Sequence, residues 1–210
     1  MSTLAVIGTF YGRHDRTEAL VRRVMESTRP PDEFWVMCES DEDARYVPRM
    51  WKALHVQVLP TIMRDGKYAE IPYSRKINWA LDRTRADLIV YLDNGSMPDR
   101  EKYELMAAAL EEHPDWGAVY CGQHRTGHLD VLAHAGDVIE DAYCVLNYTQ
   151  VMHRRTEDRW TLDMQYAAPM DLADALFWRS LHASLGAFHP VAAGRLLDEH
   201  HIESAKAVGL

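Results

Sequence analysis

Short apolar runs alternate with segments of helical periodicity along the first 121 residues of the chain. The apolar runs, which are typical of strands buried on both faces, lie at residues 4–7, 34–38, 55–59, 88–92 and 116–121. The segments with one apolar helical face lie at residues 15–25, 43–54, 74–84 and 99–112. Regular alternation of strand and helix is typical of an α/β fold, so we predict a mostly parallel central sheet with helices on both faces.

The regular alternation weakens after residue 121, where the chain becomes rich in histidine, aromatic residues and methionine. In this half we predict a strand at residues 145–154, a helix at 172–185 and a last short helix from His200. Near the start of the chain, Asp15 and Glu18 have the spacing of a capping box, which predicts a helix that begins there. Because no repeat or linker divides the chain, we expect one domain, residues 1–210, with an irregular C-terminal half that shapes a binding site.

Composition narrows the class of protein. A chain of 210 residues with 47% hydrophobic content can bury a core without disulfides or metals. The net charge of −9 argues against a large basic surface for nucleic acid, although a local basic groove remains possible. Cys38, Cys121 and Cys144 are odd in number and widely spaced, which argues against a disulfide framework and a structural zinc site. With no apolar stretch near the ~18 residues of a membrane span, we expect a cytoplasmic protein without a membrane span.

The most informative segment follows the apolar run at residues 88–92, where Asp93, Asn94 and Gly95 end the predicted strand. In open α/β sheets, ligands bind beyond the carboxyl ends of the strands, so Asp93 is placed to meet a metal ion or a phosphate. The same residues also suit a tight turn that needs positive φ, in which case Asp93 only supports the turn.

Polar residues also follow the first two predicted strands. Thr9, Tyr11 and Arg13 offer a hydroxyl, an aromatic face and a guanidinium, which suit a nucleotide base and phosphate. Glu39 and Asp41 follow the second strand, where an acceptor can bind a base N–H or a ribose hydroxyl. A structural turn and a solvated acidic loop are the alternatives, and the dinucleotide-binding and P-loop glycine patterns are both absent from the sequence.

Cations in the first turns of the helix predicted at residues 74–84 are a further signal. Arg75 and Lys76, with Asn78 close behind, oppose the helix dipole unless an anion is present. Their position therefore favours contact with phosphate over a solvated face.

Three segments, residues 4–13, 74–81 and 89–98, together resemble the GT-A glycosyltransferases, most closely the inverting family 2. The resemblance covers roughly the first 120 residues. It implies a single Rossmann-like GT-A domain with a nucleotide-sugar-binding half, residues 1–121, and an acceptor-binding half, residues 122–210. The implied activity is transfer of a sugar, with inversion, from a UDP- or GDP-sugar to a hydroxyl of a glycan, a protein or a small molecule.

The resemblance also implies roles for individual residues. The implied donor-binding residues are Thr9, Tyr11, Arg13, Glu39, Asp41, Arg75, Lys76, Asn78, Asp93 and Asn94. Asp93 matches the first acidic residue of the Asp-x-Asp turn that binds a divalent metal ion, Mn²⁺ or Mg²⁺. Gly95 stands at the second acidic position, so the remaining metal ligand would be His200 or His201, in a late segment that resembles the metal-binding histidine of such enzymes. Adjacent histidines near a terminus are, alternatively, surface residues.

The catalytic base of this family is a carboxylate at the start of a helix in the acceptor half, and residues 170–179 resemble that element. Asp171 is the first candidate for the base and Asp174 the second, although Asp171 is also a good helix N-cap. Trp178 and Arg179 are candidates for binding the acceptor, with a place in the core as the alternative for Trp178.

Three other functions remain open from the sequence. A nucleotidyltransferase on a similar sheet would need a glycine-rich, basic first loop, which Gly8 to Arg13 fit poorly. A non-catalytic nucleotide-sugar-binding relative would explain Gly95. A glycosyltransferase that acts on modified nucleic acid is disfavoured by the acidic charge.

Overall fold

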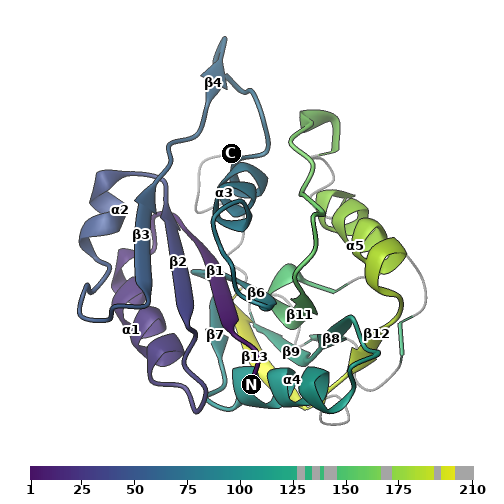
Figure 1. Ribbon diagram of the computed structural model, residues 1–210. Helices are drawn as coiled ribbons and strands as arrows, with labels where there is room; N and C mark the ends of the chain where they lie inside the picture. The colour runs from purple at the N-terminus through teal and green to yellow at the C-terminus, as the bar shows by residue number, and fades with distance from the viewer. Residues whose placement is uncertain (127–130, 134–137, 140–145, 167–171, 192–194, 202–210) are drawn as a thin grey trace.

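The computed structural model describes residues 1–126, 131–133, 138–139, 146–166, 172–191 and 195–201 (Figure 1). Its largest sheet has seven strands in the order β12-β8-β11-β6-β1-β2-β3. These strands are β1 (Leu4–Phe10), β2 (Glu33–Cys38), β3 (Leu54–Val58), β6 (Leu88–Asp93), β8 (Ala118–Tyr120), β11 (Val151–Arg154) and β12 (Phe188–Pro190). Neighbouring strands are parallel except where β11 pairs antiparallel with β6 and with β8. The predicted α/β class with a mostly parallel sheet is confirmed.

Alternate residues of the central strands enter two separate cores, one on each face of the sheet. Leu4 and Val6 of β1 pack with the first core, which is covered by the helices α1 (His14–Met25) and α4 (Lys102–Glu112). Ala5 and Ile7 pack with the second core, which is covered by α3 (Pro72–Leu81) and α5 (Leu172–Leu185). Because both faces of each central strand are buried, these strands read in the sequence as continuous apolar runs.

A four-stranded sheet in the order β10-β9-β13-β7 forms the second layer of strands. Its strands are β7 (Ser96–Pro98), β9 (Gly122–Thr126), β10 (Val131–Ala133) and β13 (Leu196–His201). In the antiparallel ladder between β13 and β7, His200 lies opposite Ser96. This pairing brings the backbone of the late histidine segment close to the turn that begins at Asp93.

A two-stranded hairpin, β4 (Met63–Arg64) and β5 (Lys67–Tyr68), extends from the sheet at the top of Figure 1. Its turn has Asp65 and Gly66 at φ values of 50° and 73°, which suits a tight two-residue hairpin. Two short 3₁₀ helices, η1 (Tyr148–Gln150) and η2 (Met164–Tyr166), complete the described elements. None of the described helices is long and apolar enough to cross a membrane.

Three local predictions are wrong. The helix expected at residues 43–54 is only α2 (Asp41–Arg45), because Pro48 cannot continue a helix and Ser40 with Asp43 forms the capping box. The N-cap of α1 is Arg13, which makes no side-chain capping bond, so Asp15 and Glu18 form no capping box.

A last short helix was expected to begin at His200, but His200 and His201 end strand β13 (Leu196–His201), which pairs with both β7 and β9. The rest of that predicted helix lies outside the described residues. The strand expected at residues 145–154 is also shorter, since η1 precedes β11.

Candidate functional site

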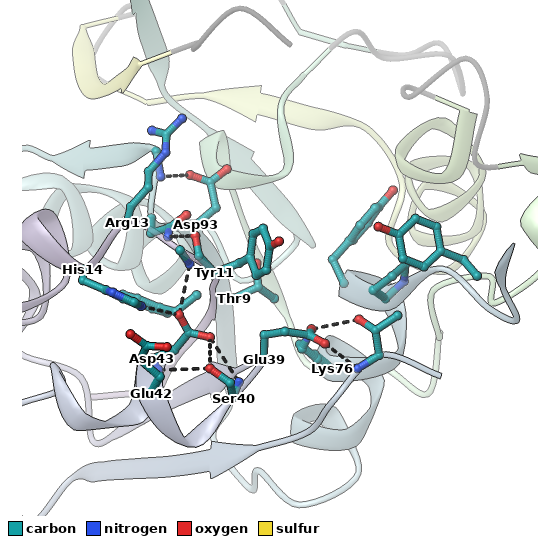
Figure 2. A pocket seen from close by; sticks show the side chains of 18 of the residues that line it. Thr9, Tyr11, Arg13, His14, Glu39, Ser40, Glu42, Asp43, Lys76 and Asp93 are labelled. Carbon is teal, nitrogen blue, oxygen red and sulfur yellow. Dashed lines mark hydrogen bonds and ion pairs between the residues drawn. The ribbon is translucent and has the colours of Figure 1, made fainter. Parts of the chain in front are cut away.

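The carboxyl ends of β1, β2 and β6 open onto one cleft with a volume of about 1040 Å³ (Figure 2). Most of the residues predicted to bind a donor line it, namely Thr9, Tyr11, Arg13, Glu39, Lys76, Asp93 and Asn94. Sequence reasoning missed three further lining residues of chemical interest, His14, Asp43 and Tyr73. The topology therefore gathers side chains from three loops that are far apart in the sequence.

Three other predicted donor-binding residues do not line the cleft. Asp41 is exposed at the start of α2, and Arg75 pairs with Glu70 at 2.8 Å. The Asn78 side chain binds the backbone of Trp160, donating to its carbonyl at 2.8 Å and accepting from its N–H at 2.9 Å. Asn78 thus fastens α3 to the loop before α5.

Asp93 is the last residue of β6, and both of its carboxylate oxygens accept hydrogen bonds. Its Oδ1 accepts from the Gly95 N–H at 2.7 Å and the Ser96 hydroxyl at 3.1 Å, and its Oδ2 accepts from the Tyr148 hydroxyl at 3.0 Å. Burial and the negative charge of Asp93 raise the pKa of Tyr148 well above its ordinary value, so that hydroxyl stays a donor. Asp93 therefore supports the turn and lines the cleft at the same time.

Glu39 and Lys76 form an ion pair across the cleft wall, and the Lys76 side chain is only 7% exposed. Glu39 also accepts from the Thr61 N–H at 2.6 Å and the Thr61 hydroxyl at 2.8 Å. Burial alone would raise the pKa of Glu39, but the hydrogen bonds from Lys76 and Thr61 outweigh it and hold the pKa below its usual range. The opposite charges of this pair compensate each other within the protein.

Asp43 joins the first two loops of the cleft. Its carboxylate accepts from the Gly12 N–H at 3.0 Å and from the Ser40 hydroxyl at 2.8 Å, and it binds His14 Nε2 at 2.7 Å (Figure 2). These partners outweigh the effect of burial and hold the pKa of Asp43 below its usual range. The imidazole of His14 also stacks on Tyr46, with ring centroids 4.2 Å apart. The capping-box spacing of Ser40 and Asp43 was the one sequence signal for this junction.

Of the two candidates for the catalytic base, the structure describes only Asp174. Asp171 lies outside the described residues. Asp174, in the first turn of α5, accepts a hydrogen bond of 3.3 Å from the hydroxyl of the cleft residue Tyr73. The structure therefore connects the second candidate to the cleft.

The two predicted acceptor-binding residues have different environments. Trp178 is fully buried, and its indole N–H donates to the Leu146 carbonyl at 3.1 Å. The prediction that Trp178 binds an acceptor is wrong for this structure, because a buried ring offers no face to a sugar. Arg179 is exposed on the next position of α5.

A divalent metal ion is not accommodated by the described side chains alone. Among the described residues, no group of three or more His, Cys, Asp or Glu side chains is arranged to hold a metal ion. Asp93 is the one carboxylate of its turn, because Gly95 occupies the second position. The backbone of His200 pairs with that of Ser96, while the side chains of His200 and His201 lie outside the described residues.

Known structures provide an independent comparison, whereas no protein-family model and no curated protein matches the chain. Residues 1–349 of S. aureus TarS superpose with a TM-score of 0.69 at 14% identity, covering 95% of this chain and 60% of that one. The complex of the same fragment with UDP-GlcNAc gives 0.68 at 12% identity, with coverages of 97% and 59%. The complex with UDP gives 0.65 at 12% identity, with coverages of 96% and 61%. The chain thus spans about three fifths of the TarS fragment, and a likeness at this identity shows a shared fold.

Proposed function

We propose that this chain, which has the GT-A fold, is a glycosyltransferase that moves a sugar from a nucleoside-diphosphate sugar to an acceptor hydroxyl with inversion. One observation carries the proposal: the ends of β1, β2 and β6 gather Thr9, Asp43 and Asp93 around a single cleft. The structures that share the fold include complexes with UDP and UDP-GlcNAc, which makes uridine nucleotides the first donors to test.

The nucleoside and diphosphate would bind where β1 and β2 end. Thr9 and Tyr11 would contact the nucleoside, and Tyr11 is 63% exposed, so its ring is accessible. Arg13 would contact the diphosphate, because it lines the cleft as the N-cap of α1, where the helix dipole also favours an anion.

The transfer itself would be a direct displacement. The acceptor oxygen attacks the anomeric carbon as the bond from that carbon to the diphosphate oxygen breaks, and the nucleoside diphosphate leaves with the bonding electrons. A carboxylate takes the proton of the acceptor hydroxyl, and Asp171 and Asp174 are the candidates. Attack opposite the leaving group inverts the configuration at the anomeric carbon.

A metal ion is a separate part of the proposal. It would require Asp93 together with His200 or His201, and it would contribute positive charge near the diphosphate. Calorimetry of UDP with and without Mn²⁺, on the unaltered protein and on a His200→Ala, His201→Ala variant, tests this part. Equal UDP affinity under all four conditions would contradict it.

The direct test of the proposed function is release of UDP or GDP from a panel of nucleotide sugars, with and without candidate acceptor sugars. The expected result is release of UDP or GDP by the unaltered protein and loss of this release in an Asp93→Ala variant that is folded. If the protein binds no nucleotide sugar at all, the proposed function is wrong.

A second function is favoured by the hydrogen bonds that Asp93 already accepts from Gly95, Ser96 and Tyr148. A binding protein that holds a nucleotide sugar without transferring it needs neither a second carboxylate nor a base. Tight donor binding without any turnover, in the presence of acceptor sugars, would identify this alternative.

A further inference from the structure

The cleft has two chemically different sides. Where β1 and β2 end, its wall is made of polar side chains that are paired with each other, among them His14, Ser40 and Asp43. Around the start of α3, aromatic and apolar side chains form the wall, among them Tyr68 and Tyr73. A nucleotide sugar has the same division, because its nucleoside and diphosphate are polar or charged while a pyranose ring has an apolar face of C–H groups.

On the aromatic side, two stacked tyrosines link Asp93 to Asp174, the second candidate for the catalytic base. The rings of Tyr73 and Tyr148 lie nearly parallel, with centroids 6.2 Å apart and planes inclined by 11°. The Tyr148 hydroxyl donates to Asp93 at 3.0 Å, and the Tyr73 hydroxyl donates to Asp174 at 3.3 Å. Of the two rings, that of Tyr73 lines the cleft.

The tyrosine pair rests on a rigid support. Both rings pack edge-on against Trp160, each with centroids 5.9 Å apart, and Trp160 is only 2% exposed. Asn78 holds the backbone of Trp160 through its two side-chain hydrogen bonds. Because Trp160 is buried and its backbone is held by Asn78, we expect the Tyr73 ring to keep one orientation in the cleft.

We propose that Tyr73 seats the sugar of the donor, with its ring against the apolar face of the sugar and its hydroxyl keeping Asp174 at the edge of that sugar. The inference rests on the proposed function and assigns a residue to one part of the donor. Asn78 becomes a positioning residue, since it acts through Trp160 and not by contact with the donor. The expected ligand class is a neutral pyranose, because the two neighbouring carboxylates disfavour an anionic sugar.

Calorimetric titration with UDP and with UDP-GlcNAc separates the sugar from the nucleotide. Tyr73→Leu keeps apolar bulk against Trp160 but removes the aromatic face, and it should lower the affinity for UDP-GlcNAc about tenfold while UDP affinity changes less than about twofold. Tyr73→Phe keeps the ring and should retain UDP-GlcNAc affinity within about twofold. The matched control is Tyr11→Ala, at the nucleoside side of the cleft, which should weaken both ligands by the same factor.

Equal losses for UDP and UDP-GlcNAc in Tyr73→Leu, or no loss for either, would overturn the assignment of Tyr73. Failure of the unaltered protein to bind either ligand would overturn the proposed function, and this inference with it. A measurement on the unaltered protein covers the case in which Tyr73→Leu does not fold. Saturation transfer from aromatic protons should reach the GlcNAc ring protons as well as the uracil protons, and transfer to uracil alone would contradict the inference.

Discussion

The two sides of the cleft are held in place by different forces. On the nucleoside side, Glu39 forms an ion pair with Lys76, and the carboxylate of Asp43 binds the imidazole of His14. On the sugar side, Asp93 and Asp174 accept hydrogen bonds from tyrosines whose rings stack above an aromatic core. One side of the cleft is therefore held by polar side chains that pair with each other, whereas the other is held by packed rings whose hydroxyls bind two carboxylates.

The largest effect should come from the predicted catalytic carboxylates. Replacing the base by its amide, in Asp171→Asn and in Asp174→Asn, should lower sugar transfer roughly 10²–10⁴-fold in one of the two variants, because a neutral amide cannot accept the acceptor proton. UDP affinity should stay unchanged in both. Steady-state rates and calorimetry on the same preparations check this prediction. Native rates in both variants would show that neither Asp171 nor Asp174 is the catalytic base.

The next effect concerns Asp93. Asp93→Ala should lower turnover about 10²-fold or more, because the variant would lose the carboxylate that is proposed to hold a cation beside the leaving diphosphate. Asp93→Asn is the matched variant, since it can still accept from Gly95 and Ser96 and should preserve the turn. If Asp93→Asn turns over like the unaltered protein, the charge at this position has no catalytic role.

As the pH falls, the protein should first lose stability through a buried histidine on the sugar side, and only at lower pH through the carboxylates of the nucleoside side. Buried His153 binds the Tyr91 hydroxyl beneath the tyrosine pair, and burial lowers the pKa of this imidazole from 6.5 to about 4. Between these pH values only the unfolded chain takes up the proton, so stability is fully present above pH 6.5 and falls by up to about 3 kcal/mol as the pH approaches 4. Denaturant titrations at several pH values measure this loss.

The control is His153→Gln, which keeps a hydrogen-bonding side chain that does not titrate. This variant should show a flatter dependence between pH 6.5 and 4. The carboxyls of Asp43 and Glu39 have lowered pKa values, so their contribution is present above their ordinary values of 3.8 and 4.5 and is lost only as the pH falls through the lower folded values. If the stability of His153→Gln falls equally steeply between pH 6.5 and 4, His153 is not the cause of the loss.

The smallest effect should follow from weakening the nucleoside-side pair. Glu39→Gln keeps the shape of the side chain but leaves the buried Lys76 without its counter-charge. UDP affinity should change by about tenfold or less, because the pair supports the wall and the bound nucleotide is held by other groups as well. Calorimetry with UDP measures this change in affinity. A loss of UDP affinity of 10²-fold or more would contradict the expectation that the ion pair matters less than the carboxylates of the sugar side.

The sequence predicted those features of the fold that depend on residues close together in the chain. The runs at residues 4–7 and 88–92 predicted central strands, because burial on both faces leaves only apolar residues in them. From those strands the positions of Thr9 and Asp93 at the cleft follow directly, since parallel strands end at the same edge of the sheet.

Other features depended on partners distant in the chain. Tyr73 contacts Asp174, which is 101 positions away, and no local pattern marks that pair. Strand β13 forms by pairing with β7 and β9, and no local pattern at residues 196–201 predicted it. Asn78 and Trp178 carried polar and aromatic groups suited to ligands, but both side chains make contacts within the protein instead, with the backbone of Trp160 and of Leu146.

Hydrogen exchange of backbone amides with and without UDP-GlcNAc tests most directly whether the cleft at the strand ends binds a nucleotide sugar. The account predicts slower exchange, on ligand addition, in residues 9–14, 39–43 and 93–95, the loops that follow β1, β2 and β6. Unchanged exchange in all three loops at saturating ligand, or protection confined to another part of the molecule, would contradict it.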